Sequence, residues 1–245
     1  FAFKTSNRDK GIEASSQKKN LYLTAIQKEI HILSYGFSNK KVLLSHGWAG
    51  RSTQLFMLAN KLLEKGFMVI SFDAPAHGKS SGKTTNMLEY IETIKAIHEE
   101  FGPFKAAIGH SFGGMALIKT TSEKEFFNCL VTVGAGDKIS DIIKNFTNNL
   151  GLKSIISKKM KLFIEKKYQI KLIDYDANEA AKKIKIETLI VHDTIDGDVS
   201  VSCAVNIRLN LQKGSLYITN GLGHTKILRD KTVTNKIVNF IIEHS

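Results

Sequence analysis

Residues 108–114 read Ile-Gly-His-Ser-Phe-Gly-Gly, and this stretch constrains the fold more than any other part of the chain. A short apolar run at 105–108 leads into it, and residues 115–118 continue as an apolar segment that suits a helix. The order predicts a buried strand, a sharp turn with Ser111 at its tip, and a helix. Glycines flank the serine because a side chain at either place would strike the adjoining strand or helix. Such a turn strains the serine backbone and exposes its hydroxyl.

Short apolar runs alternate with segments of helical spacing through most of the chain. Two strands at 21–25 and 29–34 are predicted to form an antiparallel edge. Because strand and helix alternate after them, the sheet must be mostly parallel, with helices on both faces. The predicted fold class is therefore α/β, with a doubly wound sheet. Strands are predicted at 41–45, 67–72, 105–108, 129–133, 188–192 and 216–219, and helices at 55–63, 87–101, 199–211 and 232–243.

The 245 residues, of which 42% are hydrophobic, suit one large domain. Only two prolines occur, and neither a low-complexity linker nor a repeat divides the chain. We predict a polar N-terminal arm at 1–20 and a single domain at 21–245.

One segment, at about 137–185, interrupts the alternation of strands and helices. Within it, residues 139–150 and 155–168 each place apolar side chains on one helical face. A third, short helix is predicted to start near Asp176, with Glu179 three residues on in the manner of a capping box. This insertion is predicted to be a helical cap.

The formal net charge is +12, and residues 137–185 supply half of it, with 12 lysines against six acidic residues. Such a charge attracts anionic partners. Nucleic-acid modules, however, interleave the charge with aromatic residues or place arginines at base-reading positions, and neither pattern is present. We expect a solvated lysine-rich face and no nucleic-acid partner.

Cys129 and Cys203 are the only cysteines and lie in apolar segments, which favours neither a disulfide framework nor a cysteine metal site. A reducing cytoplasm suits this composition. No apolar run approaches the roughly 20 residues of a membrane-spanning helix, so no stable membrane insertion is expected. The sequence begins at Phe1 rather than methionine, which leaves a removed targeting segment open.

Reactive side chains follow the ends of several predicted strands. His46, Asp73, Ser111 and Asp137 each lie just past a strand, and ligands of such sheets gather at the carboxyl ends of the strands. A serine hydroxyl is a weak nucleophile at neutral pH and needs a general base that an acid orients. The sequence therefore indicates a nucleophilic site at one edge of the sheet.

Four landmarks occur in order along the chain, and together they resemble the α/β-hydrolase superfamily, in its serine esterase and lysophospholipase-like branch with a helical cap. The similarity covers nearly everything from about Leu21 to Ser245 except the cap. Ala76 and Asp193 depart from the pattern, because glycine is common at both places. The landmarks are His46-Gly47-Trp48, Asp73 with His77-Gly78-Lys79-Ser80, Gly109-His110-Ser111-Phe112-Gly113, and Asp196 with Gly223-His224.

The resemblance implies that Ser111 is the nucleophile and that an acid and then a histidine follow it along the chain. His192, His224 and His244 are the histidines in that part of the sequence. His224 is the implied base, because it follows the last predicted strand on a glycine-rich loop that can carry an imidazole over Ser111.

The acid implied by the resemblance is Asp196, which lies in a loop similar to the family's H-x-x-x-D-x-x-V pattern starting at His192. Asp137 is the rival, because some members place their acid after the preceding strand. Asp193 and Asp198 are expected to cap the turn or the following helix.

The resemblance also implies an oxyanion hole made by the backbone N–H groups of Trp48 and of Phe112, the latter at a helix N-terminus. No cofactor is expected. The histidines of the chain show no H-x-x-x-H spacing on a helix, so no metal is expected either. Residues 78–84 imitate a phosphate-binding loop, but the glycines are one residue too close and no strand leads directly into it.

These features predict a serine hydrolase that cleaves a carboxylic ester or thioester of a small molecule through an acyl-serine intermediate. The alternative is a non-catalytic binding module on the same fold, with a basic surface for membrane or nucleic acid. The sequence leaves the substrate and the oligomeric state open.

The cap helices are expected to lie over the strand ends, where their apolar stripes would wall an acyl pocket. Phe163 and Ile164 would then set the preference for acyl length. The lysines of the opposite face are expected to lie in solvent, where their charges are screened over about 8 Å. These lysines are Lys158, Lys159, Lys166 and Lys167.

Overall fold

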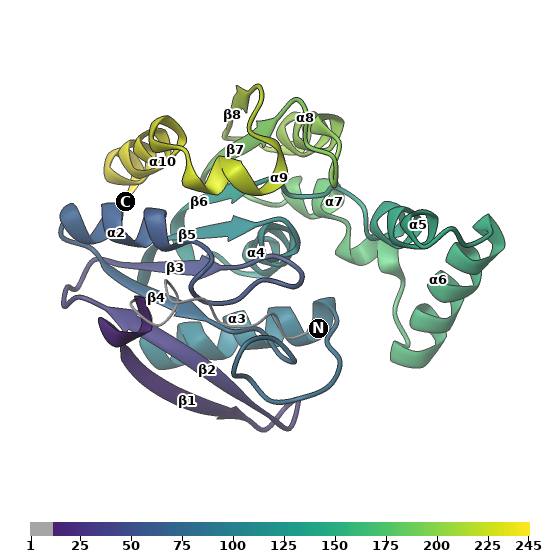
Figure 1. Cartoon of the computed structure of the whole chain (residues 1–245), viewed down its shortest axis with the longest axis horizontal. Helices are drawn as coiled ribbons and strands as arrows, with labels where there is room; N and C mark the ends of the chain where they lie inside the picture. Colours follow the sequence, from purple (N-terminus) through teal and green to yellow (C-terminus); the bar gives the residue numbers. More distant parts are fainter. Residues whose placement is uncertain (1–11) are drawn as a thin grey trace.

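The computed structural model describes residues 12–245 and shows an eight-stranded sheet flanked by helices (Figure 1). The strands lie in the order β1-β2-β4-β3-β5-β6-β7-β8. β2 pairs antiparallel with β1 and with β4, and all other neighbours are parallel. The mostly parallel sheet that the alternation predicts is confirmed. The strands are β1 (Gln17–Leu23), β2 (Lys28–Tyr35), β3 (Lys41–Ser45), β4 (Met68–Phe72), β5 (Phe104–His110), β6 (Phe127–Val133), β7 (Glu187–Asp193) and β8 (Gly214–Thr219).

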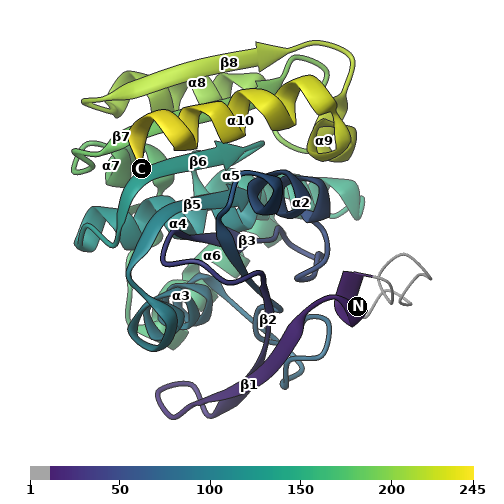
Figure 2. The same cartoon turned by 90° about the vertical axis from the view of Figure 1, so that its left-hand side faces the viewer.

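Helices cover both faces of the sheet (Figure 2). They are α2 (Phe56–Glu64), α3 (Met87–Phe101), α4 (Phe112–Glu123), α7 (Ala177–Ala181), α8 (Val201–Asn210), α9 (Gly223–Lys226), the 3-10 turn η2 (Ile227–Arg229) and α10 (Lys231–His244). One apolar core lies between the sheet and α2 and α10, and the other lies against α3, α4, α7 and α8. On β3, Val42 and Leu44 belong to the first core and Leu43 to the second. Because both faces of the inner parallel strands β3 to β7 are buried, these strands read as nearly continuous apolar runs, whereas the edge strand β8 is partly exposed.

The ends of the elements follow local backbone requirements. The helix predicted at 87–101 is α3, and α2 ends just before Gly66, whose φ of 78° suits a residue without a Cβ. The N-terminal arm is shorter than predicted, because β1 begins at Gln17 and residues 12–14 already form a helical turn. The rest of that predicted arm, residues 1–11, lies outside the described part of the chain.

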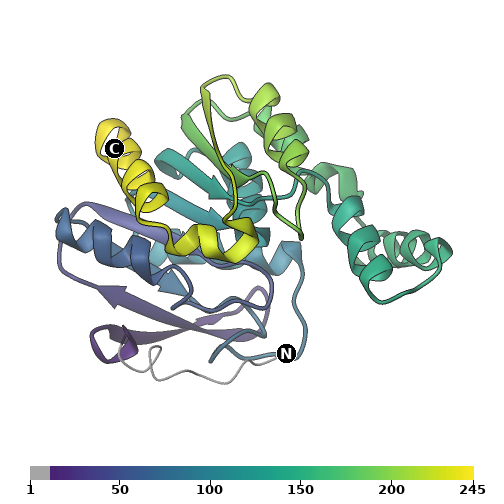
Figure 3. The same cartoon turned by 45° about the horizontal axis from the view of Figure 1, so that its top comes forward.

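The insertion forms the helices that its pattern predicts: α5 (Ile139–Asn149), α6 (Ser154–Tyr168) and, after the 3-10 turn η1 (Leu172–Tyr175), α7. Helices α5 and α6 form a hairpin that extends away from the body of the molecule (Figures 1 and 3). Helix α7 instead belongs to the core, where Ala177 and Ala181 are fully buried.

The expected role of Phe163 in the wall of a pocket is wrong, because this residue is 65% exposed. No residue of α6 is fully buried. Met160 and Ile164 form its inner side, where they are half-buried and pack against the core. An amphipathic pattern shows which side of a helix packs, but it does not show how far the helix stands from the sheet.

The predicted capping box at Asp176 is also wrong, because the carboxylate of this residue caps a different helix. Its Oδ1 accepts the backbone N–H of Ile139, the first residue of α5, at 2.8 Å. Burial raises the pKa of Asp176 to about 6, although this hydrogen bond opposes the shift. The contact joins the entry of the insertion to its exit, two points that the sequence separates by 37 residues.

The turn at Ser111 packs backbone against backbone. A Cβ added at Gly113 would lie 2.3 Å from the carbonyl oxygen of His46 and 2.6 Å from that of Ser45, and one added at Gly109 would lie 2.6 Å from the Cα of Gly114. Neither neighbour can move without shifting β3 or α4. The two glycines of the pattern are therefore required by contact between segments.

We predict that Gly113→Ala lowers the free energy of unfolding by about 2–3 kcal/mol, because the new methyl group meets rigid backbone. Gly197→Ala is the matched control, since a Cβ there meets no atom within 4 Å and the backbone is not left-handed. Urea unfolding of both variants measures the difference. Equal stability of the two variants would contradict the packing described here.

Candidate active site

Ser111 lies between β5 and α4 with φ 51° and ψ −121°. A left-handed φ in a residue with a side chain costs on the order of 1–3 kcal/mol and persists only where the surroundings hold it. The N–H of Ser111 donates to the carbonyl of Val133 on β6 at 2.8 Å, and its carbonyl accepts the N–H of Gly114 at 3.0 Å. The half-buried serine is thus fixed from the neighbouring strand and from its own helix.

His224 lies in α9, which starts four residues after β8 and was not predicted from the sequence. Its Nδ1 lies 2.7 Å from Oδ2 of Asp196, so Nδ1–H donates and Nε2 is left to accept a proton. The backbone carbonyl of His224 accepts a hydrogen bond from Nε2 of His110 at 2.9 Å, and the two rings lie 4.7 Å apart. His224 is therefore held beside Ser111, the next residue after His110.

No hydrogen bond joins the Ser111 hydroxyl to His224 among the residues that the structure describes. Contacts of this kind are often long before a substrate binds and tighten in the complex. What the structure brings together is the imidazole, its carboxylate partner and the serine turn.

Asp196 accepts hydrogen bonds on both carboxylate oxygens. Oδ1 accepts the backbone N–H groups of Asp198 and Val199 at 2.9 Å each, and Oδ2 faces His224 and, at 3.4 Å, Nε2 of His192. Burial by itself would raise the pKa of Asp196, but the hydrogen bonds from His192, His224 and Val199 outweigh it and hold the pKa well below its usual range. Asp196 is therefore an ionised acceptor for the imidazole.

Asp137, the rival acid, is engaged elsewhere. Its carboxylate is buried and accepts a hydrogen bond from Nδ2 of Asn206 on α8 at 2.8 Å. The structure brings Asp196 to His224 and leaves Asp137 against α8. Of the other histidines, His192 is fully buried with Nε2 2.9 Å from the carbonyl of Val199, and it supports the acid loop.

Asp193 has two structural roles, of which the sequence predicted only one. Its Oδ1 accepts the N–H of Ile195 at 3.0 Å, which confirms the expected capping of the turn. Its Oδ2 also accepts the hydroxyl of Thr219 at 2.7 Å and the N–H of Leu222 at 3.0 Å, and these groups belong to β8 and to the loop before His224. Burial opposes the shift, but these hydrogen bonds lower the pKa of Asp193 to about 2.

Asp193 therefore ties the loop that carries the acid to the loop that carries the histidine. The sequence holds one indication of this role, because Asp193 stands at a position where glycine is common in the α/β-hydrolase superfamily.

The two candidate oxyanion donors lie on segments next to Ser111. A Cβ added at Gly47 would lie 2.9 Å from the Cβ of Ser111, so the chain leading to Trp48 runs directly against the serine. Phe112 is the first residue of α4, where N–H groups have no acceptor within the helix. The rings of Trp48 and Phe112 meet edge to face at 5.4 Å. The segments that carry Trp48 and Phe112 therefore both lie next to Ser111.

A family model described as alpha/beta hydrolase fold matches residues 40–183, which is more than half of the chain. The chain belongs to the α/β-hydrolase fold family. No helix in the described part of this α/β-hydrolase is long and apolar enough to cross a membrane.

Solved structures of the same fold cover nearly the whole chain. A membrane phospholipase A, described as a bacterial virulence factor, is 16% identical with a TM-score of 0.73 and covers 96% of this chain and 90% of its own. Est1E of Butyrivibrio proteoclasticus with bound ferulic acid is 17% identical with a TM-score of 0.71, and the match covers 91% of this chain and 98% of that chain. A monoacylglycerol lipase of Paleococcus ferrophilus is 22% identical with a TM-score of 0.71, and the match covers 88% of this chain and 99% of that chain. No curated protein matches the sequence. At these identities the likeness shows the fold alone.

Two histidines of the α/β-hydrolase, the buried His46 and the half-buried His77, fix the loops around Trp48. Nε2 of His46 accepts the N–H of Ala74 at 2.9 Å, and Nδ1–H donates to the carbonyl of Gly47 at 2.7 Å. Nε2 of His77 accepts the N–H of Ala49 at 3.1 Å. Burial, followed by the neighbouring His77, lowers the pKa of His46 to about 4, so the ring stays neutral and can accept. His46, the first residue of the His-Gly-Trp landmark, thus has an architectural role.

Asp73, the second landmark, does not contact the acid or the base. Its carboxylate accepts the backbone N–H groups of Ser52 at 2.6 Å and of Lys79 at 2.8 Å. A Cβ at Gly78 would lie 2.2 Å from this carboxylate, which explains the glycine of the motif. Asp73 therefore joins the loop after β4 to the loop after β3.

Asp196, Asp198 and His224 bring ligand-type atoms within 4.8 Å of one another in the described chain. Both oxygens of Asp196 already accept hydrogen bonds, and Nδ1 of His224 is one of the donors. A cation here would have to displace the imidazole proton. The arrangement suits a hydrogen bond rather than a metal ion.

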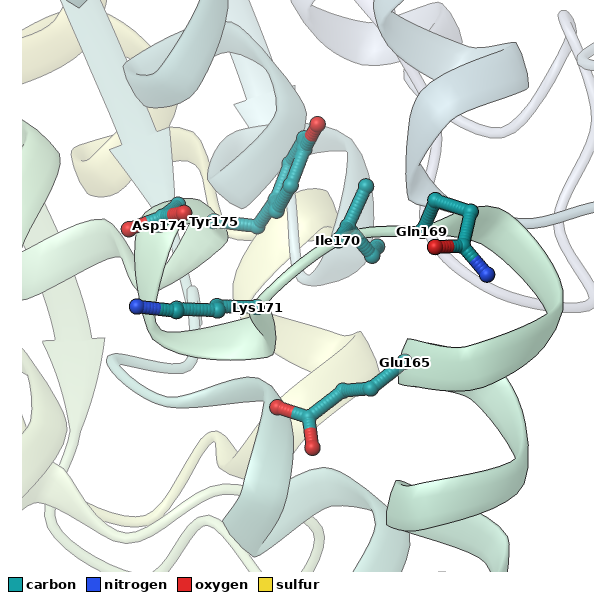
Figure 4. A pocket seen from close by; sticks show the side chains of 6 residues that line it. All are labelled: Glu165, Gln169, Ile170, Lys171, Asp174 and Tyr175. Carbon is teal, nitrogen blue, oxygen red and sulfur yellow. The ribbon is translucent and has the colours of Figure 1, made fainter.

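A hollow of about 530 Å³ lies at the end of α6, and Ser111 is not among the residues that line it (Figure 4). Glu165 and Gln169 line it from α6 and the turn after it, and Asp174 and Tyr175 line it from η1. Its charged groups have both signs, which does not suit an apolar acyl chain. The remaining lining residues are Ile170 and Lys171.

We predict that the stability of the protein falls between pH 7 and pH 4 in part through His46. In the unfolded chain this ring takes up a proton near pH 6.5, whereas in the fold it does so near pH 4, so stability is complete above pH 6.5 and is lost as the pH falls. Replacement by His46→Gln keeps an acceptor and a donor without titration. Urea unfolding at pH 7 and pH 4 should show a loss about 3 kcal/mol smaller in His46→Gln than in the wild type. An equal loss of unfolding free energy between pH 7 and pH 4 in the two proteins would refute the contribution of His46.

Proposed function

We propose that this α/β-hydrolase is a serine hydrolase that cleaves an ester-like bond, a carboxylic ester or a thioester, through an acyl-serine intermediate. The observation that carries the proposal is the 2.7 Å hydrogen bond between His224 and the buried, ionised Asp196, beside a serine held at a left-handed φ. A strained serine, an imidazole with a free Nε2 and an orienting carboxylate are the parts that acyl transfer requires.

In the first half of the reaction, Oγ of Ser111 attacks the carbonyl carbon of the substrate while Nε2 of His224 takes the hydroxyl proton. The carbonyl oxygen becomes an oxyanion, which the N–H groups of Trp48 and Phe112 would stabilise at the N-terminus of α4. Collapse of this intermediate breaks the ester bond, and His224 gives its proton to the leaving alcohol or thiol. The acyl group stays on Ser111.

In the second half, water replaces the leaving group. His224 takes a proton from water, the hydroxide attacks the acyl carbon, and Ser111 regains its proton as the acid product leaves. Asp196 remains ionised throughout. It fixes the tautomer of His224 and stabilises the imidazolium that forms in each half.

The chemistry of neighbouring structures supports an ester-like substrate. They include an esterase, a monoacylglycerol lipase and a thioesterase domain. With identities of 11–22% among the compared structures, carboxylesterase-like specificity and a small-molecule ester substrate are part of our proposal. We also propose a cytoplasmic location, since Cys129 and Cys203 are free thiols.

We predict that a fluorophosphonate probe labels Ser111 and that Ser111→Ala lowers turnover of an activated ester about 10³-fold or more. The alanine variant should unfold at the same temperature as the wild type or slightly above it, because the strained residue loses only its hydroxyl. Mass spectrometry locates the label. Labelling at another serine, or full turnover by Ser111→Ala, would overturn the assignment of the nucleophile.

We predict that Asp196→Asn lowers turnover by orders of magnitude, because an amide at Oδ2 favours the wrong tautomer of His224. Asp137→Asn is the matched control, since it removes a buried carboxylate that hydrogen-bonds Asn206 and does not contact His224. Turnover of the same activated ester should fall no more than a few-fold in the control. A larger loss of turnover in Asp137→Asn than in Asp196→Asn would assign the acid to Asp137.

A further inference from the structure

The hairpin of α5 and α6 exposes large apolar side chains to solvent. Six such residues, each between 42% and 65% exposed, lie within 18 positions of the sequence. The hairpin extends from the body, so no other part of the described chain covers this surface (Figures 1 and 3). We call these residues the hairpin apolar set: Phe146, Leu150, Leu152, Ile155, Leu162 and Phe163.

The outer face of α6 carries apolar and basic residues together. Ile155, Lys159, Leu162 and Lys166 follow one another at intervals of four, three and four residues, so they share one face, and all four are exposed. The opposite face, with Met160 and Ile164, packs against the core. The outer face therefore cannot close over Ser111 unless the packed face is released.

No carboxylate of the described residues 12–245 forms an ion pair with the positive charge of this face. Residues 150–168 contain six lysines and a single acidic residue, Glu165, whose carboxylate accepts the N–H of Leu172. Within residues 12–245, no ion pair joins any of these six lysines to a carboxylate. Lys167 lies over the rings of Phe163 and Tyr168, at 5.9 and 5.2 Å.

We propose that the α5–α6 hairpin docks the protein reversibly onto an anionic lipid surface. The hairpin apolar set would enter the region between headgroups and acyl chains, and the lysines would contact the lipid phosphates with their long stems along the apolar boundary. This proposal concerns the exposed side chains of the hairpin and does not depend on the chemistry of Ser111.

Charge and polarity favour this partner over two others. A second copy of the chain would bring two lysine-rich faces together, which costs free energy. A nucleic acid would neutralise the lysines, but its phosphate backbone would leave Ile155 and Leu162 in water. A lipid surface provides an anionic layer and an apolar layer at once.

The test uses the full chain and sedimentation with vesicles of phosphatidylcholine alone or of equal parts phosphatidylcholine and phosphatidylglycerol. We expect binding to the anionic vesicles only, and weaker binding as salt increases. Exchange of Lys158, Lys159, Lys166 and Lys167 for glutamine should weaken binding roughly a hundredfold or more, at about fivefold for each lysine. Thermal unfolding checks that each variant folds.

A matched control removes the same charge elsewhere. Lys183, Lys185, Lys213 and Lys231 are exposed and lie outside the hairpin, so their exchange for glutamine should change binding no more than a few-fold. A second pair of variants tests the apolar contribution. Leu162→Ser with Phe163→Ser should reduce binding about tenfold or more, whereas Leu209→Ser, at a residue 75% exposed on α8, should not.

Three results would overturn the proposal. Equal losses from the hairpin and control lysines would show a diffuse effect of net charge. Binding to duplex DNA or RNA that exceeds binding to anionic vesicles at the same salt would assign the face to nucleic acid. A dimer in light scattering that Leu162→Ser with Phe163→Ser dissociates, without vesicle binding by the wild type, would assign it to a second copy.

Discussion

The close approach of α4 to the end of β3 is the constraint on which the rest of the structure depends. Gly113 lies so near the carbonyl oxygens of Ser45 and His46 that no side chain fits between them. This contact forces the chain to turn sharply at Ser111 and fixes the left-handed φ of that residue. It also sets Gly47 against Ser111, so that one contact positions the serine, the start of α4 and the loop of Trp48.

Around that contact, buried polar side chains hold loops by accepting backbone N–H groups. His46 and Asp73 do so between the loops after β3 and β4, and Asp193 does so between the loops after β7 and β8. Asp196 accepts backbone N–H groups of its own loop and reaches the loop after β8 through the His224 side chain. Each of these side chains accepts at least one backbone N–H group, so a substitution that removes the acceptor would leave that N–H unpaired. The reactive edge of the sheet is therefore rigid before any substrate arrives, which suits a site that must stabilise charge without reorganising.

Much of the fold follows from the sequence because the sheet is buried on both faces. Runs such as 41–45 can only be strands of a covered parallel sheet, and the glycines near Ser111 have one structural explanation. The motif order suggests that Asp196 pairs with His224, whereas the position of Asp137 against Asn206 is visible only in the structure. Which aspartate contacts the histidine is decided by the three-dimensional arrangement of the loops, and a single sequence does not reveal that arrangement.

The orientation of the hairpin and the partner of Asp176 could not be predicted, for a related reason. Helical spacing in 155–168 identifies an inner face but not the distance from the sheet. A carboxylate near a helix start can cap that helix or any other N-terminus within reach, and here it reaches Ile139.

That contact between Asp176 and Ile139 has an evolutionary meaning. Since the two ends of the α5–α6 segment meet at one hydrogen bond, the segment leaves and rejoins the α/β body at nearly one point. Because the two ends lie together, descendant sequences can lengthen or shorten the segment without changing the strand order, provided that they keep the side chains that pack on the core, such as Ile143 and Ile164. The body and the hairpin can therefore diversify at different rates, and a chimera that carries a hairpin from another member at this junction should keep an intact sheet.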